Sequence, residues 1–130
     1  MQGYLTNIEA ETLENTDYRR VLYTTDELQL VVMSLAPGQE IGEEVHELSQ
    51  FIRVEAGQGV VVLAGETQPL PADHAVVIPA GTRHNVRNEG AVDLKLYSIY
   101  APPEHQRTTV HPGKADETEE HFDGSTDVDA

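Results

Sequence analysis

The chain has 130 residues, which suits a single domain with a hydrophobic core and leaves no room for another. It contains no cysteine, which excludes disulfide frameworks, thiolate metal sites and cysteine nucleophiles, so any metal must be held by nitrogen and oxygen. The net charge of −15 argues against nucleic acid and anionic membranes as partners, because both require clustered lysine and arginine.

The first residues contain no basic region followed by an apolar stretch, and no segment has the length and hydropathy of a membrane span. We therefore expect a cytoplasmic protein. Its acidity suits an ordinary cytosolic protein and a protein from concentrated salt equally well.

Short apolar or alternating runs separated by turn residues recur about every eight to twelve positions, a spacing typical of an all-β sandwich or barrel. This pattern leaves little room for helices, and we expect residues 3–24 to supply edge strands. The last run ends at Ala101-Pro102-Pro103, because consecutive prolines cannot donate to a ladder. The predicted strands are residues 20–24, 28–35, 50–55, 60–63, 75–78, 84–88 and 94–100.

The C-terminal residues differ in composition from the rest of the chain. Residues 114–130 are rich in aspartate and glutamate and hold hardly any large apolar side chain, so burial cannot offset the entropy of ordering them. We predict a barrel domain at residues 1–112 and a disordered acidic tail at residues 113–130.

A first group of side chains able to bind a metal lies between Gly38 and Gly59. Glu44, His46 and Gln50 are separated by even numbers of residues, so in a continuous strand they would project to the same face. The sequence therefore predicts a carboxylate, an imidazole and an amide on one face.

A second group lies within residues 73–88, where a predicted buried strand and a Pro79-Ala80-Gly81 turn precede His84. If the two segments pair across a barrel, His84 joins Glu44, His46 and Gln50. Two imidazoles, one carboxylate and one amide oxygen suit a single divalent ion of iron, manganese, nickel, zinc or copper, with positions left open for water or substrate. Gln50 either binds the metal directly or hydrogen-bonds to a bound water or substrate.

The two groups resemble the two motifs of the cupin family. The first motif, G-x5-H-x-H-x3,4-E-x6-G, has the spacing of Gly38, Glu44, His46, Gln50 and Gly57. The second motif, G-x5-P-x-G-x2-H-x3-N, has the spacing of Asp73, Pro79, Gly81, His84 and Asn88. The resemblance covers residues 28–103. It implies a double-stranded β-helix, or jelly-roll, barrel that is usually dimeric and holds a metal near its centre.

Three positions depart from the family pattern. Glu44 stands in place of a histidine, Gln50 in place of the glutamate and Asp73 in place of a glycine. The first two exchanges keep one carboxylate and four donors, so metal binding is expected to survive them. The metal preference and the reactivity need not be those of the usual ligand set.

The remaining histidines match no motif position, and we expect surface or loop locations for His74, His105, His111 and His121. Strand alternation predicts an apolar lining for the site, supplied by Ile52, Val54 and Val86. Tyr100 and Met33 are candidates for the two ends of the pocket, although residues of these types are more often plain core residues.

Function must come from the site, because this barrel carries dioxygenases, isomerases, lyases, storage proteins and sensors. We favour a metal-dependent enzyme, dioxygenase-like or isomerase-like, acting on a small organic molecule. A sugar-phosphate isomerase lacks an evident phosphate-binding cluster, since alternation turns Arg87 away from the face of His84. The alternative is a non-catalytic barrel that binds a metal or small ligand as a sensor or store. A homodimer is expected in either case.

Overall fold

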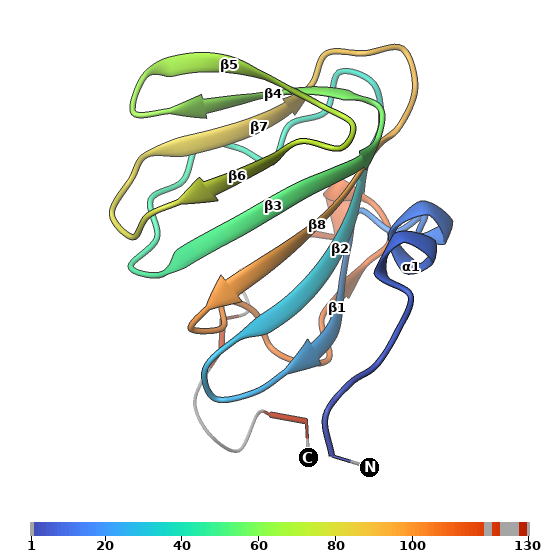
Figure 1. Ribbon diagram of the computed structural model, residues 1–130, viewed down its shortest axis with the longest axis vertical. Helices are drawn as coiled ribbons and strands as arrows, with labels where there is room; N and C mark the ends of the chain where they lie inside the picture. Colours follow the sequence, from blue (N-terminus) through green and yellow to red (C-terminus); the bar gives the residue numbers. More distant parts are fainter. Residues whose placement is uncertain (1, 119–120, 123–127, 130) are drawn as a thin grey trace.

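The computed structural model describes residues 2–118, 121–122 and 128–129, and most of this chain is antiparallel β-sheet (Figure 1). One sheet has the strand order β6-β3-β8-β2-β1-β9, and the other has the order β5-β4-β7. The strands are β1 (Arg19–Thr24), β2 (Gln29–Leu35), β3 (Ser49–Ala56), β4 (Gln58–Leu63), β5 (Glu66–Pro71), β6 (Ala75–Ile78), β7 (His84–Asn88), β8 (Leu94–Ala101) and β9 (Val110–His111).

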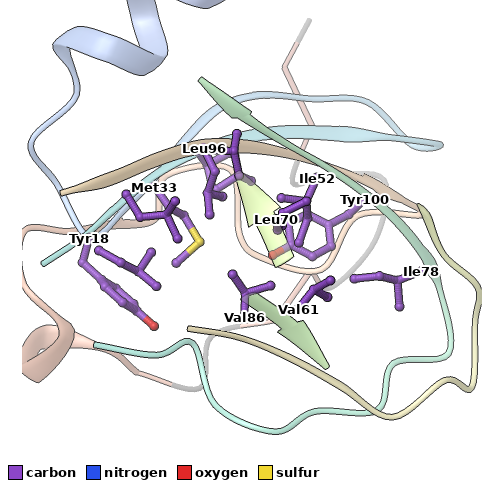
Figure 2. Close-up of a cluster of buried hydrophobic side chains, with 14 of the residues drawn as sticks. Tyr18, Met33, Ile52, Val61, Leu70, Ile78, Val86, Leu96 and Tyr100 are labelled. Atoms are coloured by element: carbon purple, nitrogen blue, oxygen red, sulfur yellow. The ribbon is translucent and has the colours of Figure 1, made fainter. Parts of the chain in front are cut away.

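The two sheets face each other around one hydrophobic core, which gives the expected jelly-roll barrel. Successive residues of a strand point alternately into and out of this core. Along β8, Leu94 and Leu96 are fully buried, whereas Lys95 and Tyr97, which alternate with them, are only half-buried. Figure 2 shows Met33 and Leu96 of the large sheet meeting Val86 of the small one in this core.

Two backbone positions explain parts of the motif pattern. Gly57 joins β3 to β4 with a φ of +96°, and a Cβ there would lie 2.7 Å from the carbonyl oxygen of Asp93. Asp73 has a φ of +66°, a left-handed conformation that suits the glycine usual at this position and that aspartate tolerates better than most residues. The exchange at Asp73 therefore preserves the turn.

The seven predicted strands are all present, with bounds that shift by one or two residues. Two further strands, β5 and the two-residue β9, were not predicted. The Glu66-Thr67-Gln68-Pro69 segment of β5 is exposed and carries no apolar alternation. It nevertheless pairs with β4 along its whole length, at the edge of the small sheet where proline is tolerated.

The expectation of edge strands across residues 3–24 is wrong for the first part of that range. Residues Ile8–Glu14 form helix α1, and the side chain of Asn7 caps it by accepting a hydrogen bond from the Ala10 amide at 3.1 Å. The helix packs on β2, β3 and β8 of the large sheet, and its Thr12 is fully buried there. Only β1 within this range is a strand, and it is not at the edge, because β9 pairs with it on the outer side.

Part of the predicted tail is ordered. Lys114–Asp116 form the short 3-10 helix η1, and Lys114 donates to the backbone oxygen of Ile41 at 3.1 Å and to the Tyr18 hydroxyl at 3.3 Å. The predicted disorder therefore does not extend to residues 114–118, whereas residues 119–120, 123–127 and 130 lie outside the described residues. Among the residues that are described, no helix is long and apolar enough to cross a membrane.

Candidate metal centre and adjoining pocket

The four predicted metal ligands come from three parts of the fold. Glu44 and His46 lie in the segment between β2 and β3, Gln50 lies in β3, and His84 begins β7. Glu44 and His84 exchange two backbone hydrogen bonds of 2.9 Å in an isolated bridge, which places the two residues opposite each other. The imidazoles of His46 and His84 stand 5.1 Å apart, centre to centre, so three of the four residues are brought together.

The geometry differs from the expected continuous strand through Glu44, His46 and Gln50. Strand β3 starts only at Ser49, and residues 47–48 form a bend. Glu44 is positioned by the edge of β7 instead, and His46 is held where its backbone oxygen accepts from the Gly81 amide at 2.7 Å. The Pro-x-Gly turn therefore fixes the position of the first histidine as well as the second.

Glu44 and His46 form an ion pair, with 2.6 Å between Oε2 and Nε2. Burial opposes ionisation of Glu44, but the hydrogen bond from His46 and the positive charges of His46 and Arg19 outweigh it and lower the carboxyl pKa. Burial likewise disfavours the charged imidazole, yet the hydrogen bond and charge of Glu44 raise the pKa of His46. Each residue thus favours the charged form of the other.

His84 is oriented as metal-binding histidines usually are. Its Nδ1 donates to the backbone oxygen of Thr82 at 2.8 Å, and this contact fixes the proton on Nδ1. The other ring nitrogen, Nε2, is left as a lone-pair donor for a metal or as an acceptor for a ligand.

Gln50 supplies the most informative atom of the site. Its amide nitrogen donates to the hydroxyl of Ser98 at 3.3 Å, whereas its Oε1 is buried without a hydrogen-bond partner among the described residues. Nδ1 of His46 is buried without a partner in the same way. An unsatisfied buried polar atom costs about 1–3 kcal/mol, so the Gln50 oxygen is a strong candidate for a ligand contact.

Within the part of the chain that the structure describes, no three carboxylate or imidazole groups are arranged as they would be around a metal ion. The ion pair between Glu44 and His46 explains why these groups do not surround a metal position. Two donors bound to one zinc at about 2.0–2.2 Å each lie roughly 3.4 Å apart in tetrahedral geometry. The 2.6 Å contact between Glu44 and His46 is too short for that, so a metal and the ion pair exclude each other.

Sequence reasoning placed one of the remaining histidines wrongly, because His111 lies in strand β9 with only 5% of its surface exposed. His105 lies in a loop as expected, yet it is buried there with 8% of its surface exposed, and His74 and His121 are exposed. The side chain of buried Gln29 fixes the loop of His105, because it donates to the His105 backbone oxygen at 2.6 Å and accepts from its amide at 3.0 Å. A glutamine inside an otherwise apolar strand was the sequence signal for this contact.

Tyr100 connects His105 with the candidate metal ligands. Its ring lies 5.3 Å from that of His105 and 6.2 Å from that of His46, and the residue is paired with Gln50 in the sheet. Burial raises the pKa of Tyr100, so its hydroxyl stays protonated. Tyr100 thus lies at the site, while Met33, the other candidate, is a fully buried core residue.

Glu44 of the candidate centre also lines a pocket of about 480 Å³. The pocket lies between strand β1 of the large sheet and the segment that pairs with β7, and its lining includes Glu44 and His105. The predicted apolar lining is absent from its walls, because Ile52, Val54 and Val86 are closed into the core. Its lining residues are Arg19, Ile41, Gly42, Glu43, Glu44, Glu104, His105, Glu117, Thr118 and His121.

Comparison with known proteins agrees with this fold. A sequence profile of the cupin domain matches residues 31–100. The chain is 44% identical over 120 residues to the YrkC protein of Bacillus subtilis, and this alignment covers 87% of the chain but only 64% of YrkC. It is 38% identical over 69 residues to the polyketide synthase CurC of Streptomyces cyaneus, covering 52% of the chain and 45% of CurC.

Among solved structures, BH2720 of Bacillus halodurans superposes with a TM-score of 0.86 at 48% sequence identity. The superposition covers 88% of this chain and 92% of that protein. The cupin profile spans more than half of the chain, and the fold is that of a protein nearly half identical in sequence. The chain therefore belongs to the cupin family.

Proposed function

We propose that Glu44, His46, Gln50 and His84 hold one divalent metal ion and that the pocket admits a small organic molecule to it. The observation that carries this proposal is the buried Gln50 Oε1, which lacks a hydrogen-bond partner among the residues that the structure describes. When bound, a metal of this kind polarises a carbonyl or hydroxyl oxygen, or binds dioxygen together with a substrate.

The side chains fit a metal in chemical type. Oε1 of Gln50 has no partner among the described residues that metal binding would have to displace, and the contact that orients His84 uses its other nitrogen, Nδ1. Glu44 and His46 would exchange their mutual hydrogen bond for the metal, and His46 would give up its proton. A reaction of the dioxygenase or isomerase type then fits the site, with the neutral Tyr100 hydroxyl as a hydrogen-bond donor near it.

The similarity to CurC, a protein named as a polyketide synthase, supports an organic small molecule as the ligand. The similarity covers about half of each chain, so it supports a shared barrel that takes a small molecule and does not identify the reaction.

A metal-free barrel that binds a small ligand is the second candidate. The ion pair of Glu44 and His46 favours it, because these two groups already satisfy each other without a metal. In that case His84 and Gln50 would contact the ligand directly, and the barrel would serve as a sensor or store.

Elemental analysis separates the two candidates. The protein, purified without a histidine tag, is offered iron, manganese, nickel, copper and zinc in turn, and the bound metal is counted by mass spectrometry. We expect about one ion per chain, lost in His84→Ala and retained in His74→Ala, which removes an exposed histidine. Metal retained in His84→Ala, or none bound by the wild type, contradicts the metal centre and favours the metal-free candidate.

We also propose a homodimer that buries the outer face of the large sheet. Val77, Phe51, Ile99 and Leu30 lie side by side across β6, β3, β8 and β2, and 64% of Val77 is exposed. Such an apolar row on a sheet is typical of an interface. Sedimentation should give a dimer that Val77→Glu dissociates and Val92→Glu, an equally exposed control, leaves intact. A monomeric wild type contradicts it.

A further inference from the structure

A charged side chain occupies an inward-facing position of the barrel. Arg19 pairs with Met33 in the sheet and faces the same side as that core residue, so only 4% of its side chain is exposed. A buried guanidinium is unfavourable unless it is paired and fully hydrogen-bonded. Strand alternation would place an apolar residue here, and the position therefore calls for a functional explanation.

The bonding of Arg19 is incomplete. One terminal nitrogen donates to Oε2 of Glu117 at 2.6 Å and lies 3.3 Å from Nδ1 of His111. Its Nε is buried and has no partner among the described residues. A guanidinium normally receives a carboxylate through two parallel N–H groups, so this arrangement leaves a donor for a better-placed carboxylate.

Glu117 reaches Arg19 from the C-terminal segment, which docks on the mouth of the pocket. Lys114 anchors that segment on Tyr18 and Ile41, and Thr118 contacts Nε2 of His111 at 3.4 Å. The Glu117 side chain remains 34% exposed, although it is paired with a guanidinium that is almost wholly buried. The outer partner of this pair can therefore leave while Arg19 stays in place.

The other carboxylates of the pocket are each paired with a histidine or arginine of their own. Glu44 pairs with His46, Glu104 with His121 at 2.9 Å, and Glu43 with Arg83 at 3.5 Å. Among the described residues that line the pocket, Arg19 is the one arginine or lysine. Its charge is the feature of these walls that selects an anionic group.

We propose that Arg19 is a carboxylate-binding position in the pocket, and that Glu117 occupies it as an internal carboxylate until an organic carboxylate displaces it. This inference rests on the proposed function only in taking a small organic molecule into the pocket, and it adds that the molecule is an acid. It does not require the metal.

Benzoate and its neutral analogue benzamide test the proposal on the full chain after treatment with a chelator. Binding is followed by amide NMR titration, with the Nε–H signal of Arg19 as the local reporter. We expect benzoate but not benzamide to bind and to shift that signal. Glu117→Gln should tighten benzoate binding about tenfold, the effect of removing one charged hydrogen bond. Glu66→Gln, which removes an equal charge on β5, should leave it unchanged.

Arg19→Gln should abolish benzoate binding. If that variant does not fold, the comparison of Glu117→Gln with Glu66→Gln still decides, because both keep Arg19. Equal affinity of the wild type and Glu117→Gln, or equal binding of benzoate and benzamide, overturns the proposal and leaves Glu117 as a structural ion pair. Because the protein is metal-free, either outcome is independent of whether the metal centre exists.

Discussion

The interior of the barrel has two regions of opposite character, and single strands run through both. At one end of β8 the inward residues are Leu94 and Leu96, and at the other end they are Ser98 and Tyr100. The inward residues of the neighbouring strands also change from apolar to polar. In β3 they run from Val54 to Gln50, and in β2 from Leu35 to Gln29. Gln29, Gln50 and Tyr100 therefore lie level with one another.

The two regions differ in hydrogen bonding, because buried polar atoms without a hydrogen-bond partner gather in the polar region. Five buried side-chain atoms lack a hydrogen-bond partner among the described residues, and four of them belong to Arg19, His46, Gln50 and His105 at the pocket and candidate metal centre. Each costs about 1–3 kcal/mol. The comparison indicates that the apolar region supplies the stability that the polar region gives up in order to bind.

The largest expected effect tests the apolar region. Leu96→Ala removes a fully buried side chain and should lower the free energy of unfolding by about 2–5 kcal/mol, through lost burial and the cavity left behind. Urea unfolding measures it, with Leu5→Ala, at a position 86% exposed, as the control. Similar losses in the two variants would show that Leu96 is not part of a closely packed core.

A smaller effect concerns the charge state of the polar region. Burial, together with the positive charges of Arg19, His111 and His46, lowers the pKa of His105 to about 3. The unfolded chain takes up this proton near pH 6.5, and the folded chain does not until about pH 3. Stability should therefore fall as the pH drops from 6.5 to 3, by about 2 kcal/mol at pH 5.

His105→Gln should remove this part of the pH dependence, since glutamine does not titrate and the backbone contacts with Gln29 remain. Urea unfolding between pH 7 and pH 5 measures the difference, and His74→Gln is the exposed control. Parallel pH profiles for wild type and His105→Gln would mean that His105 is protonated in the folded protein.

The fold could be predicted from the sequence because its strands follow regular spacings, and the residues of the candidate centre were selected by spacing as well. Glu44 and His84 do lie opposite each other, although a bridge to β7 places Glu44, and not the continuous strand that its spacing suggested. Arg19 and His105 carried no such signal. Their burial depends on Glu117 and Gln29, partners far away in the chain, and no periodicity relates such pairs.

The smallest expected effect tests whether the side-chain oxygen of Gln50 serves binding at a cost in stability. Gln50→Met keeps the volume of the side chain and removes the unpartnered oxygen, so the metal-free protein should gain about 1 kcal/mol in urea unfolding, less what the weak bond to Ser98 contributed. The same variant should bind a divalent metal more weakly, because one of four donors is gone. Gln68→Met on exposed β5 should change neither quantity. A variant that loses stability and keeps its metal affinity would mean that the oxygen of Gln50 is satisfied within the fold, and that the polar region needs no ligand at this position.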